Sequence, residues 1–209
     1  MDGNAALVLA AGSSRRLGSP KQLVDLGGRP LLDRVVGVVA GWPVELVVVV
    51  LGANADAILD RIDFGDAVVA VNDGWEEGLA SSLRVGFDIL TRRPRLERTF
   101  VVLGDQPHIP PQVPEALLEA AIRGDHRAIV PVYRYQWGNP VLFDRSLWPR
   151  LMTLAGDTGA SALLRTHPEW VEEIRFSELP PQDVDTPEDV ADLRASGRRG
   201  GDDGVSPSR

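Results

Sequence analysis

Residues 5–21 read AALVLAAGSSRRLGSPK. The stretch begins with a short apolar run, Ala5–Leu9, and continues into a loop that contains Gly12 and Gly18 and ends at Lys21. A buried strand that leads into a glycine-rich loop is typical of open α/β sheets, in which ligands bind beyond the carboxyl ends of the strands. The stretch therefore predicts an α/β fold and indicates the edge of the sheet at which a binding site lies.

Similar apolar runs alternate with segments of helical pattern along the chain. Strands that are apolar throughout are typical of a parallel sheet buried on both faces, and parallel neighbours are joined by right-handed crossovers. We therefore expect a Rossmann-like, three-layer α/β/α fold with a mostly parallel central sheet. The predicted strands are Ala5–Leu9, Leu46–Leu51, Ala67–Val71, Thr99–Leu103 and Ala128–Val132. The predicted helices between them are Leu31–Ala40, Ala55–Ile62, Leu79–Thr91 and Val113–Arg123.

The pattern changes after Tyr133. The elements expected there are a short strand or hairpin arm at Gly138–Phe143, helices at Leu147–Leu154 and Ala160–Arg165, a strand near Val171–Phe176 and a last helix from Pro187. We expect a single domain over residues 1–196. Residues 197–209 are rich in Gly, Asp, Ser and Arg, and this composition predicts a disordered tail.

Composition bounds the function. The chain has 209 residues, 44% of them hydrophobic, and a net charge of −8. A general nucleic-acid or membrane-surface binder would carry a basic face, so neither partner is expected. Cysteine is absent, which excludes disulfides, thiolate metal sites and a cysteine nucleophile. No signal peptide or membrane-length apolar run is seen, and we expect a cytoplasmic protein.

The loop after the first strand has the composition of an anion-binding loop. Its small residues would let backbone N–H groups approach phosphate oxygens, Arg16 could bind one phosphate bidentately, and Lys21 could reach a second. Lys21 is the only lysine in the chain. The loop matches neither a Walker A motif nor the GxGxxG fingerprint. An ordinary strand-to-helix loop that needs glycine for tight turns is the alternative.

Two segments place carboxylates where a metal could bind. Asp105 directly follows the strand that ends at Leu103, at the same edge of the sheet, and carboxylate oxygen suits Mg²⁺. A plain turn before Pro107 is the alternative. Near the end of the chain, Asp183–Asp189 reads DVDTPED, and Asp185 could be a second ligand. From the pattern alone, a helix cap built from the threonine, proline and last aspartate of this segment explains it better than a metal site does.

Other stretches carry weaker signals. Asn72–Arg84 and Gly156–Ser161 bring polar side chains to the starts of helices, where they could contact a nucleotide or cap the helix. The histidines show no zinc spacing, and no GxSxG elbow is present. The five tryptophans are scattered, which favours a packing role for them.

Together, residues 9–21, Gly104–Pro107 and Asp183–Asp189 resemble the molybdenum-cofactor nucleotidyltransferases, which have the nucleotide-diphospho-sugar transferase fold. The family loop reads roughly LAAGxSxRxGxxK, which places its arginine on Arg16 and its lysine on Lys21. The pattern is most similar to the cytidylyltransferase branch. Segments shared with that branch are Ala10–Gly12, Gly78–Ser82, Gly138–Phe143 and Gly156–Ala160.

The resemblance implies Mg²⁺-dependent transfer of a nucleoside monophosphate, with CMP from CTP favoured, to a phosphorylated acceptor such as molybdopterin. A molybdoenzyme or its maturation factor is the protein partner it suggests. The implied catalytic residues are Arg16, Lys21 and Asp105, and the implied metal ligands are Asp105 and Asp185. The implied nucleotide-binding residues are Leu9, Ala10, Ala11, Gly12, Ser13, Ser14, Lys21, Asn72, Gly78, Ser81, Ser82 and Gly104. On the acceptor side they are Gln106, Pro107, Asn139, Pro140 and Asp157.

Two positions depart from the family pattern. The family often has arginine where this chain has Ser161, and histidine where it has Asn139. Both segments would face the acceptor, so transfer of another nucleotide, such as a guanylyl group, or transfer to another phosphorylated acceptor stays open. A non-catalytic nucleotide-binding accessory protein for molybdoenzyme maturation is the third alternative.

Overall fold

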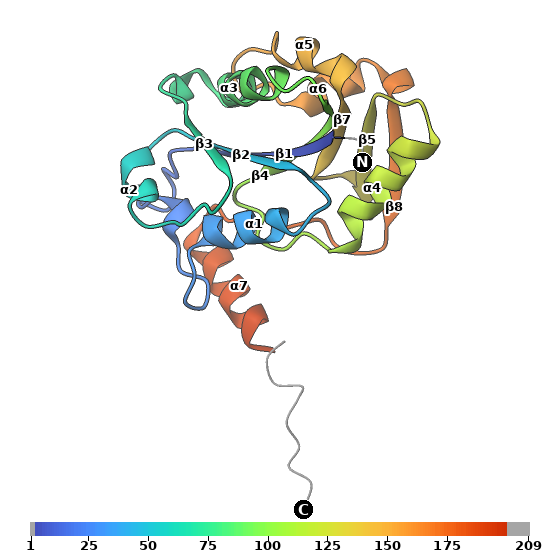
Figure 1. Cartoon of the computed structure of the whole chain (residues 1–209). Helices are drawn as coiled ribbons and strands as arrows, with labels where there is room; N and C mark the ends of the chain where they lie inside the picture. The colour runs from blue at the N-terminus through green and yellow to red at the C-terminus, as the bar shows by residue number, and fades with distance from the viewer. Residues whose placement is uncertain (1–2, 200–209) are drawn as a thin grey trace, which may run out of the picture.

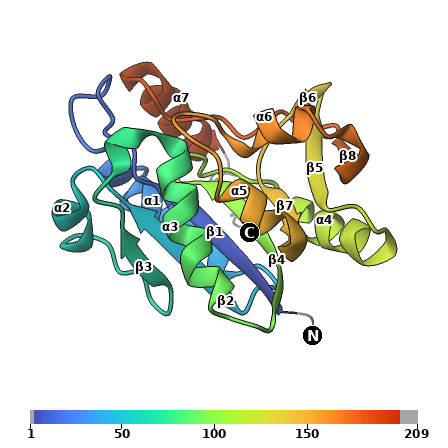
Figure 2. The ribbon, with the colours of Figure 1, turned by 90° about the horizontal axis from the view of Figure 1, so that it is seen from above.

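A central sheet stands between two layers of helices in the computed structural model, which describes residues 3–199 (Figure 1). Helices α3 (Leu79–Thr91) and α5 (Trp148–Leu151) cover one face, while α1 (Leu31–Ala40) and α4 (Gln112–Arg123) cover the other. Seen from above, α3 and α5 lie side by side over the sheet (Figure 2), and the rings of Phe87 and Trp148 meet between them with centroids 5.7 Å apart. The predicted three-layer α/β/α fold is confirmed.

The strand order is β3-β2-β1-β4-β7-β5-β6, with β8 paired to the other edge of β5. The strands are β1 Gly3–Ala10, β2 Leu46–Leu51, β3 Val68–Val71, β4 Leu96–Leu103, β5 Ala128–Tyr133, β6 Gln136–Trp137, β7 Val141–Asp144 and β8 Val171–Phe176. The pairs within β3-β2-β1-β4 are parallel, as is β5 with β8. The sheet is therefore mostly parallel, as predicted.

The segment predicted as a short strand or hairpin arm at Gly138–Phe143 interrupts this parallel arrangement. Strand β7 is antiparallel to both β4 and β5 and separates them, while β6 forms a short antiparallel pair with the end of β5. The Asn139–Pro140 peptide bond between β6 and β7 is cis. A chain reversal inside the sheet thus fills the space between the first four strands and the last ones.

Alternation along β1 divides the core into two halves. Ala6 and Val8 face a cluster that includes side chains of α1, α4 and α7 (Pro187–Arg199), whereas Ala5 and Leu7 face a cluster with side chains of α3, α5 and α6 (Ala160–Arg165). These strand residues are fully buried, and apolar burial is worth roughly 25 cal/mol per Å². The core thus fixes β1 rigidly, and with it the start of the loop that follows.

Several elements differ in length from the prediction. Helix α2 is Ala55–Leu59, and the predicted Leu147–Leu154 helix is a 3₁₀ turn at Arg145–Leu147 followed by the short α5. Further 3₁₀ turns lie at Lys21–Leu23, Trp75–Glu77 and Pro168–Trp170. Helix α7 runs through Arg199, and residues 200–209 of the predicted tail lie outside the described range. Within the described range, no helix has the length and apolar character needed to cross a bilayer.

The topology indicates where a ligand belongs. Strand β1 has β2 on one side and β4 on the other. Successive strands are therefore added in one direction from β1 to β3 and on the opposite side of β1 at β4. Crevices at such switch points, beyond the carboxyl ends of the strands, are the usual ligand sites of open α/β sheets. Leu9 near the end of β1 pairs with Leu103 at the end of β4, so the loops after these strands begin side by side.

Candidate active site

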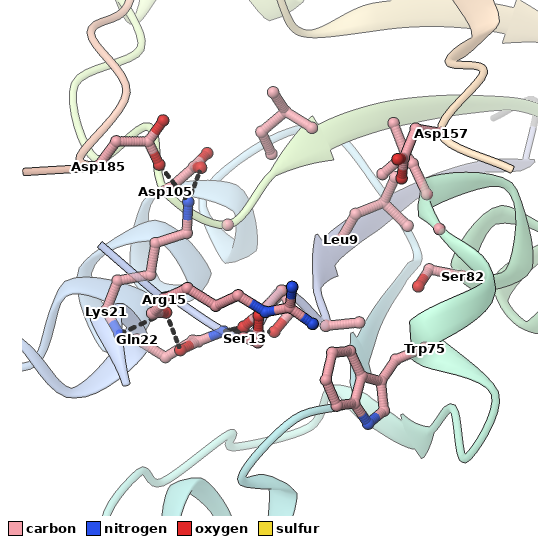
Figure 3. Close-up of a pocket in the computed structure, with 18 of the residues that line it drawn as sticks. Leu9, Ser13, Arg15, Lys21, Gln22, Trp75, Ser82, Asp105, Asp157 and Asp185 are labelled. Carbon is pink, nitrogen blue, oxygen red and sulfur yellow. Dashed lines mark hydrogen bonds and ion pairs between the residues drawn. The ribbon is translucent and has the colours of Figure 1, made fainter. Parts of the chain in front are cut away.

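A cavity of about 680 Å³ opens at this edge of the sheet (Figure 3). Its wall comes from the loop after β1, the loop after β4, the Trp75–Leu79 segment and parts of two later loops. Of the predicted nucleotide-binding residues, those that line it are Leu9, Ala10, Ala11, Gly12, Ser13, Ser14, Lys21, Gly78, Ser82 and Gly104. Asn72 and Ser81 do not line it.

The loop after β1 is closed by a buried glutamine that sequence reasoning did not single out. The Gln22 side-chain amide donates to the carbonyls of Ala10 at 2.7 Å and Gly12 at 3.1 Å, which ties the end of the loop to its beginning. Ser14 has a positive φ of 56°, and its hydroxyl accepts from the backbone N–H of Lys21 at 2.9 Å. These bonds fix the position from which the Lys21 side chain extends.

Lys21 joins the two carboxylates that the sequence placed far apart. Its Nζ lies 2.5 Å from Oδ2 of Asp105 and 2.9 Å from Oδ1 of Asp185. The side chains of Lys21 and Asp105 are 16% and 17% exposed, whereas that of Asp185 is 44% exposed. Figure 3 shows all three groups converging on one side of the cavity. Lys21 was predicted to reach a phosphate, and in the structure its charge is directed at the two aspartates.

The pKa values of Lys21 and Asp105 are shifted by burial and by the charges of their neighbours. Burial alone would lower the pKa of Lys21, but the Asp105 and Asp185 carboxylates outweigh it, so the pKa of the ammonium is raised. Burial raises the pKa of Asp105 in spite of the Lys21 ammonium, and Asp183 adds to the rise. The Lys21 shift follows the ion pair. The Asp105 shift follows burial of the carboxylate. One of its oxygens, Oδ1, is buried and has no hydrogen-bond partner among the side chains that the structure describes, residues 3–195.

The two arginines of the loop also line the cavity. Arg16 lies 3.7 Å from Asp185, with a side chain 77% exposed, so this contact is a weak surface ion pair. Arg15, which the sequence did not single out, is exposed and extends along the loop side of the cavity in Figure 3. Three cationic side chains, those of Arg15, Arg16 and Lys21, therefore line the same cavity as Asp105.

The segment before α7 contains both of the features that the sequence left open. Asp189 accepts from the backbone N–H and the hydroxyl of Thr186, and Thr186 Oγ1 accepts from the N–H of Asp189, which is the predicted capping arrangement. Asp185 nevertheless lines the cavity. Asp183 accepts instead from the Gln106 amide at 2.7 Å and does not line the cavity. Capping and a place at the site therefore coexist in this segment.

The opposite side of the cavity holds an aromatic wall that sequence reasoning missed. Trp75 is half-buried and lines the cavity, with Ser82 and Leu9 nearby in Figure 3. A Cβ added to Gly52 would lie 2.6 Å from Cβ of Trp75 and 2.8 Å from Cβ of Ala11. The missing side chain at Gly52 thus lets Trp75 pack close to the loop after β1. In the sequence, only the position of Trp75 in a turn rich in Gly, Asp and Glu could have indicated that it lines a site.

Two residues predicted to contact the nucleotide serve the fold. The Asn72 amide donates to the hydroxyls of Ser81 at 2.7 Å and Ser82 at 3.0 Å, and its Oδ1 accepts from the backbone N–H of Gly74. Ser81 in turn donates to the carbonyl of Gly78. Buried polar groups need such partners, and this network fixes the start of α3. Ser82 takes part in the network and still lines the cavity.

The residues predicted for the acceptor side are dispersed. Asp157 lines the cavity, whereas Gln106, Pro107, Asn139 and Pro140 do not. Pro107 lines a separate hollow with Trp42 and His108 on the α1 side of the sheet. The carbonyl of Asn139 accepts from the Tyr133 hydroxyl at 3.0 Å. Of this set, Asp157 alone is at the cavity.

A divalent cation is compatible with the residues present. Within residues 3–199 no three His, Cys, Asp or Glu side chains gather as a metal centre. Mg²⁺ needs no such cage, because it commonly binds one or two carboxylates and completes its shell with water and substrate phosphates. Asp105 and Asp185 could supply the carboxylates, and the unpartnered Oδ1 of Asp105 gives a reason for a cation to enter.

Comparison with known families gives one match that spans most of the chain. The MobA-like NTP transferase domain matches residues 6–171. The chain is also similar to nicotine blue oxidoreductase of Paenarthrobacter nicotinovorans, with 31% identity over 192 residues that cover 88% of this chain and 93% of that protein.

Two further relatives bear on the nucleotide and the metal. A probable molybdenum cofactor guanylyltransferase of Natranaerobius thermophilus is 29% identical over 132 residues, covering 63% of this chain and 61% of that protein. The crystal structure of Rv0371C from Mycobacterium tuberculosis, a complex with manganese, superposes with a TM-score of 0.80 and 28% identity, covering 93% of this chain and 99% of that one. The fold is thus of the nucleotide-diphospho-sugar transferase type, and the similarity includes a relative that binds a divalent metal.

Proposed function

The chain belongs to the MobA-like NTP transferase domain family, and from this premise we propose that it transfers CMP from CTP to a phosphorylated small-molecule acceptor, molybdopterin being favoured. Pyrophosphate is the other product, Mg²⁺ is the cofactor, and the cytoplasm is the compartment. One observation carries the proposal. A single cavity combines a loop rich in backbone N–H groups and cations with two carboxylates that meet on one ammonium.

The loop after β1 is the proposed phosphate-binding element. The small residues Ala11 to Ser13 leave its backbone accessible from the cavity, and Arg16 and Lys21 lie at its far end. Arg16 and Lys21 hold the triphosphate and stabilise the charge that develops on the departing pyrophosphate. Gln22 keeps the loop in register with the end of β1, so the loop backbone needs little reorganisation.

Asp105 and Asp185 are the proposed ligands of the metal. A bound dication would neutralise phosphate charge and polarise the reacting phosphoryl group. The two carboxylates come from different elements, the loop after β4 and the segment before α7, and the backbone N–H of Val184 donates to the carbonyl of Asp105 at 3.2 Å. This bond holds the two segments side by side, so both carboxylates face the same point of the cavity.

Trp75 is proposed to support the base or ribose at the other end of the cavity. Stacking of a base on an aromatic side chain contributes about 1–3 kcal/mol and tolerates any base. Trp75 therefore adds affinity without selecting cytosine. Selection falls to hydrogen-bonding groups on the cavity wall, which include the Ala10 to Gly12 backbone and the Ser82 hydroxyl.

The acceptor requires little chemical activation. A phosphate monoester has a second pKa of about 6 and is largely a dianion near neutral pH, so it attacks without a strong general base. Positioning and charge neutralisation then suffice. Asp157 at the cavity wall is the proposed acceptor-side residue, whereas Gln106, Pro107, Asn139 and Pro140 do not line the cavity.

Pyrophosphate release tests the proposal. CTP, GTP and ATP are each incubated with Mg²⁺ and with molybdopterin or simple sugar phosphates, and pyrophosphate is measured. We expect release with CTP and molybdopterin that stops when the metal is chelated. Preference for GTP would replace cytidylyl by guanylyl transfer, which the guanylyltransferase relative favours. Nucleotide binding without turnover on any acceptor would instead support the accessory-protein alternative.

A second candidate function is reduction of a conjugated organic acceptor. It is favoured by the 31% identity to nicotine blue oxidoreductase over 88% of the chain. A loop that binds triphosphate would equally bind the pyrophosphate of a nicotinamide dinucleotide. Oxidation of NADPH or NADH in the presence of a quinonoid dye, followed by absorbance, tests it. Dye-dependent oxidation together with no pyrophosphate release from any NTP would reverse the order of the two candidates.

A further inference from the structure

The contacts of Lys21 raise a question that the proposed function leaves open. If Lys21 stabilises a triphosphate, its ammonium must leave Oδ2 of Asp105 and Oδ1 of Asp185, which it contacts at 2.5 and 2.9 Å. If Asp105 and Asp185 bind a divalent cation, that cation lies beside the same two carboxylates that the ammonium contacts. Two positive charges at contact distance from one pair of carboxylates repel each other strongly in a partly buried site.

We propose that Lys21 is a positioning residue that holds Asp105 and Asp185 together and is displaced by the incoming divalent cation onto the nucleotide phosphates. This inference rests on the proposed function of the site, and it adds a coupling between metal and nucleotide to it. The cation gains the carboxylates only when the ammonium has another anionic partner. Nucleotide and metal therefore bind with positive cooperativity through one side chain.

The fold provides a fixed pivot for this movement. The backbone of Lys21 is held by its N–H donating to Ser14 Oγ at 2.9 Å and by its carbonyl accepting from the N–H of Val24 at 3.1 Å. The side chain is a flexible four-carbon stem with a compact charge, whereas an arginine is a planar fork suited to a fixed bidentate partner. Lysine occurs in this chain at this position alone, among basic residues that are otherwise arginines. The movement thus involves side-chain torsions and leaves the loop in place.

The neighbouring charges cannot replace Lys21 in this role. Arg16 is 3.7 Å from Asp185, is 77% exposed and makes no ion pair with Asp105 within residues 3–199. Asp183 accepts from Gln106 and is not a contact of Lys21. Oδ1 of Asp105 is buried and is a carboxylate oxygen that the Lys21 ammonium leaves unpartnered.

Thermodynamic linkage makes the proposal measurable without catalysis. Whatever factor nucleotide adds to the affinity for the metal, metal adds to the affinity for nucleotide. If Lys21 is displaced as proposed, removing its ammonium should change the affinity for metal alone and the affinity for nucleotide in opposite directions. The metal alone should bind more tightly, because nothing needs to be displaced, and nucleotide should bind more weakly, because a phosphate partner is lost.

Mn²⁺ binding to the full chain provides the test, followed by the electron paramagnetic resonance signal of free Mn²⁺. Wild type, Lys21→Met and Arg15→Met are titrated with Mn²⁺ alone and then with a non-hydrolysable CTP analogue present. Arg15→Met is the matched control, because it removes one positive charge from the same cavity without freeing Asp105 or Asp185. Circular dichroism establishes whether each variant is folded. If Lys21→Met is unfolded, Lys21→Gln replaces it in the titrations.

We expect Lys21→Met to bind Mn²⁺ alone about tenfold more tightly than wild type, within the range typical of coupling between sites. Arg15→Met should stay within about threefold of wild type, as expected for loss of a screened, exposed charge. The analogue should strengthen Mn²⁺ binding to wild type and have much less effect on Lys21→Met. Equal or weaker Mn²⁺ binding by folded Lys21 variants would overturn the proposal. The Mn²⁺-alone comparison stands even if no NTP is turned over, so failure of the transferase function is seen separately in the pyrophosphate assay.

Discussion

A pair of glycines in the cavity wall offers a sharp test of the site geometry. Gly78 has φ 97° and ψ −177°, a conformation open essentially to glycine alone. A Cβ at Gly78 would lie 2.5 Å from the carbonyl carbon of Gly156 and 2.6 Å from Oδ1 of Asp157. Gly12 differs in both respects, since a Cβ there would meet nothing within 4 Å and its φ is not in the left-handed region.

Gly78→Ala should destabilise the fold strongly. Backbone strain of this type costs about 1–3 kcal/mol, and overpacking against backbone adds about 1–3 kcal/mol. Taking about 4 kcal/mol for the sum, the melting temperature of a domain of this size should fall by about 8–16 °C. The turn at Gly156 accepts from the backbone N–H of Ala80 at 3.0 Å, so relief of the clash also disturbs the start of α3.

Gly12→Ala should leave stability unchanged or raise it by about 0.4–1 kcal/mol, because alanine restricts the unfolded chain. If the loop binds phosphate through its backbone, the added methyl group should weaken NTP binding at least about tenfold, or about 1.4 kcal/mol. Thermal unfolding by circular dichroism and NTP titration by calorimetry measure the two effects. Wild-type melting of Gly78→Ala would refute the packing argument, and wild-type NTP affinity of a folded Gly12→Ala would refute the phosphate loop.

Three further predictions concern single side chains. Asp105→Asn should lower the rate of pyrophosphate release on the order of a thousandfold with little change in melting temperature, as expected if Asp105 binds the catalytic metal. Asp183→Asn is the control, because the partner of Asp183 is Gln106, and it should retain activity within about tenfold. Similar losses in both variants would show that Asp105 is not a metal ligand. Trp75→Ala should weaken CTP, GTP and ATP alike by about 5–150-fold, and loss for one base alone would show selective recognition instead. The backbone N–H of Asp185 lowers the pKa of Asp189, so its stabilising contribution is present at neutral pH and is lost as pH falls below about 4. Asp189→Asn should therefore melt lower than wild type at pH 7, with a difference that shrinks in acid; a difference that persists at pH 2 would contradict this.

Local apolar patterns predicted the fold well where burial decides the conformation. Leu46–Leu51 and Leu31–Ala40 have the predicted bounds, because their apolar residues lie in the two halves of the core. The place of β7 could not be predicted in this way. Its four residues form an antiparallel bridge between β4 and β5, and such a choice of neighbours depends on contacts across the whole sheet.

The site shows the same division between local and distant information. The loop after β1 could be interpreted from its own residues, but the partners of Lys21 are 84 and 164 residues away, and no local pattern pairs them. The family resemblance implied that Asn72 and Ser81 bind the nucleotide, and the structure shows that these two buried polar side chains bond to each other and do not line the cavity. Trp75 was taken for a packing residue, since its place beside Ala11 depends on Gly52 in a different loop.

The charges of the site explain why one protein would bind nucleotide and metal together. With Lys21 on Asp105 and Asp185, the cationic loop and the carboxylates largely compensate each other, within a chain whose net charge is −8. A triphosphate alone would be drawn to the loop but repelled by both carboxylates. A dication alone would be drawn to the carboxylates but repelled by Lys21 and the loop arginines. With both present, Asp105 and Asp185 would hold the dication and the Lys21 ammonium would pair with a phosphate, so each added charge would meet its opposite. If the proposed movement of Lys21 occurs, this one side chain would make the site discriminate against either ligand alone.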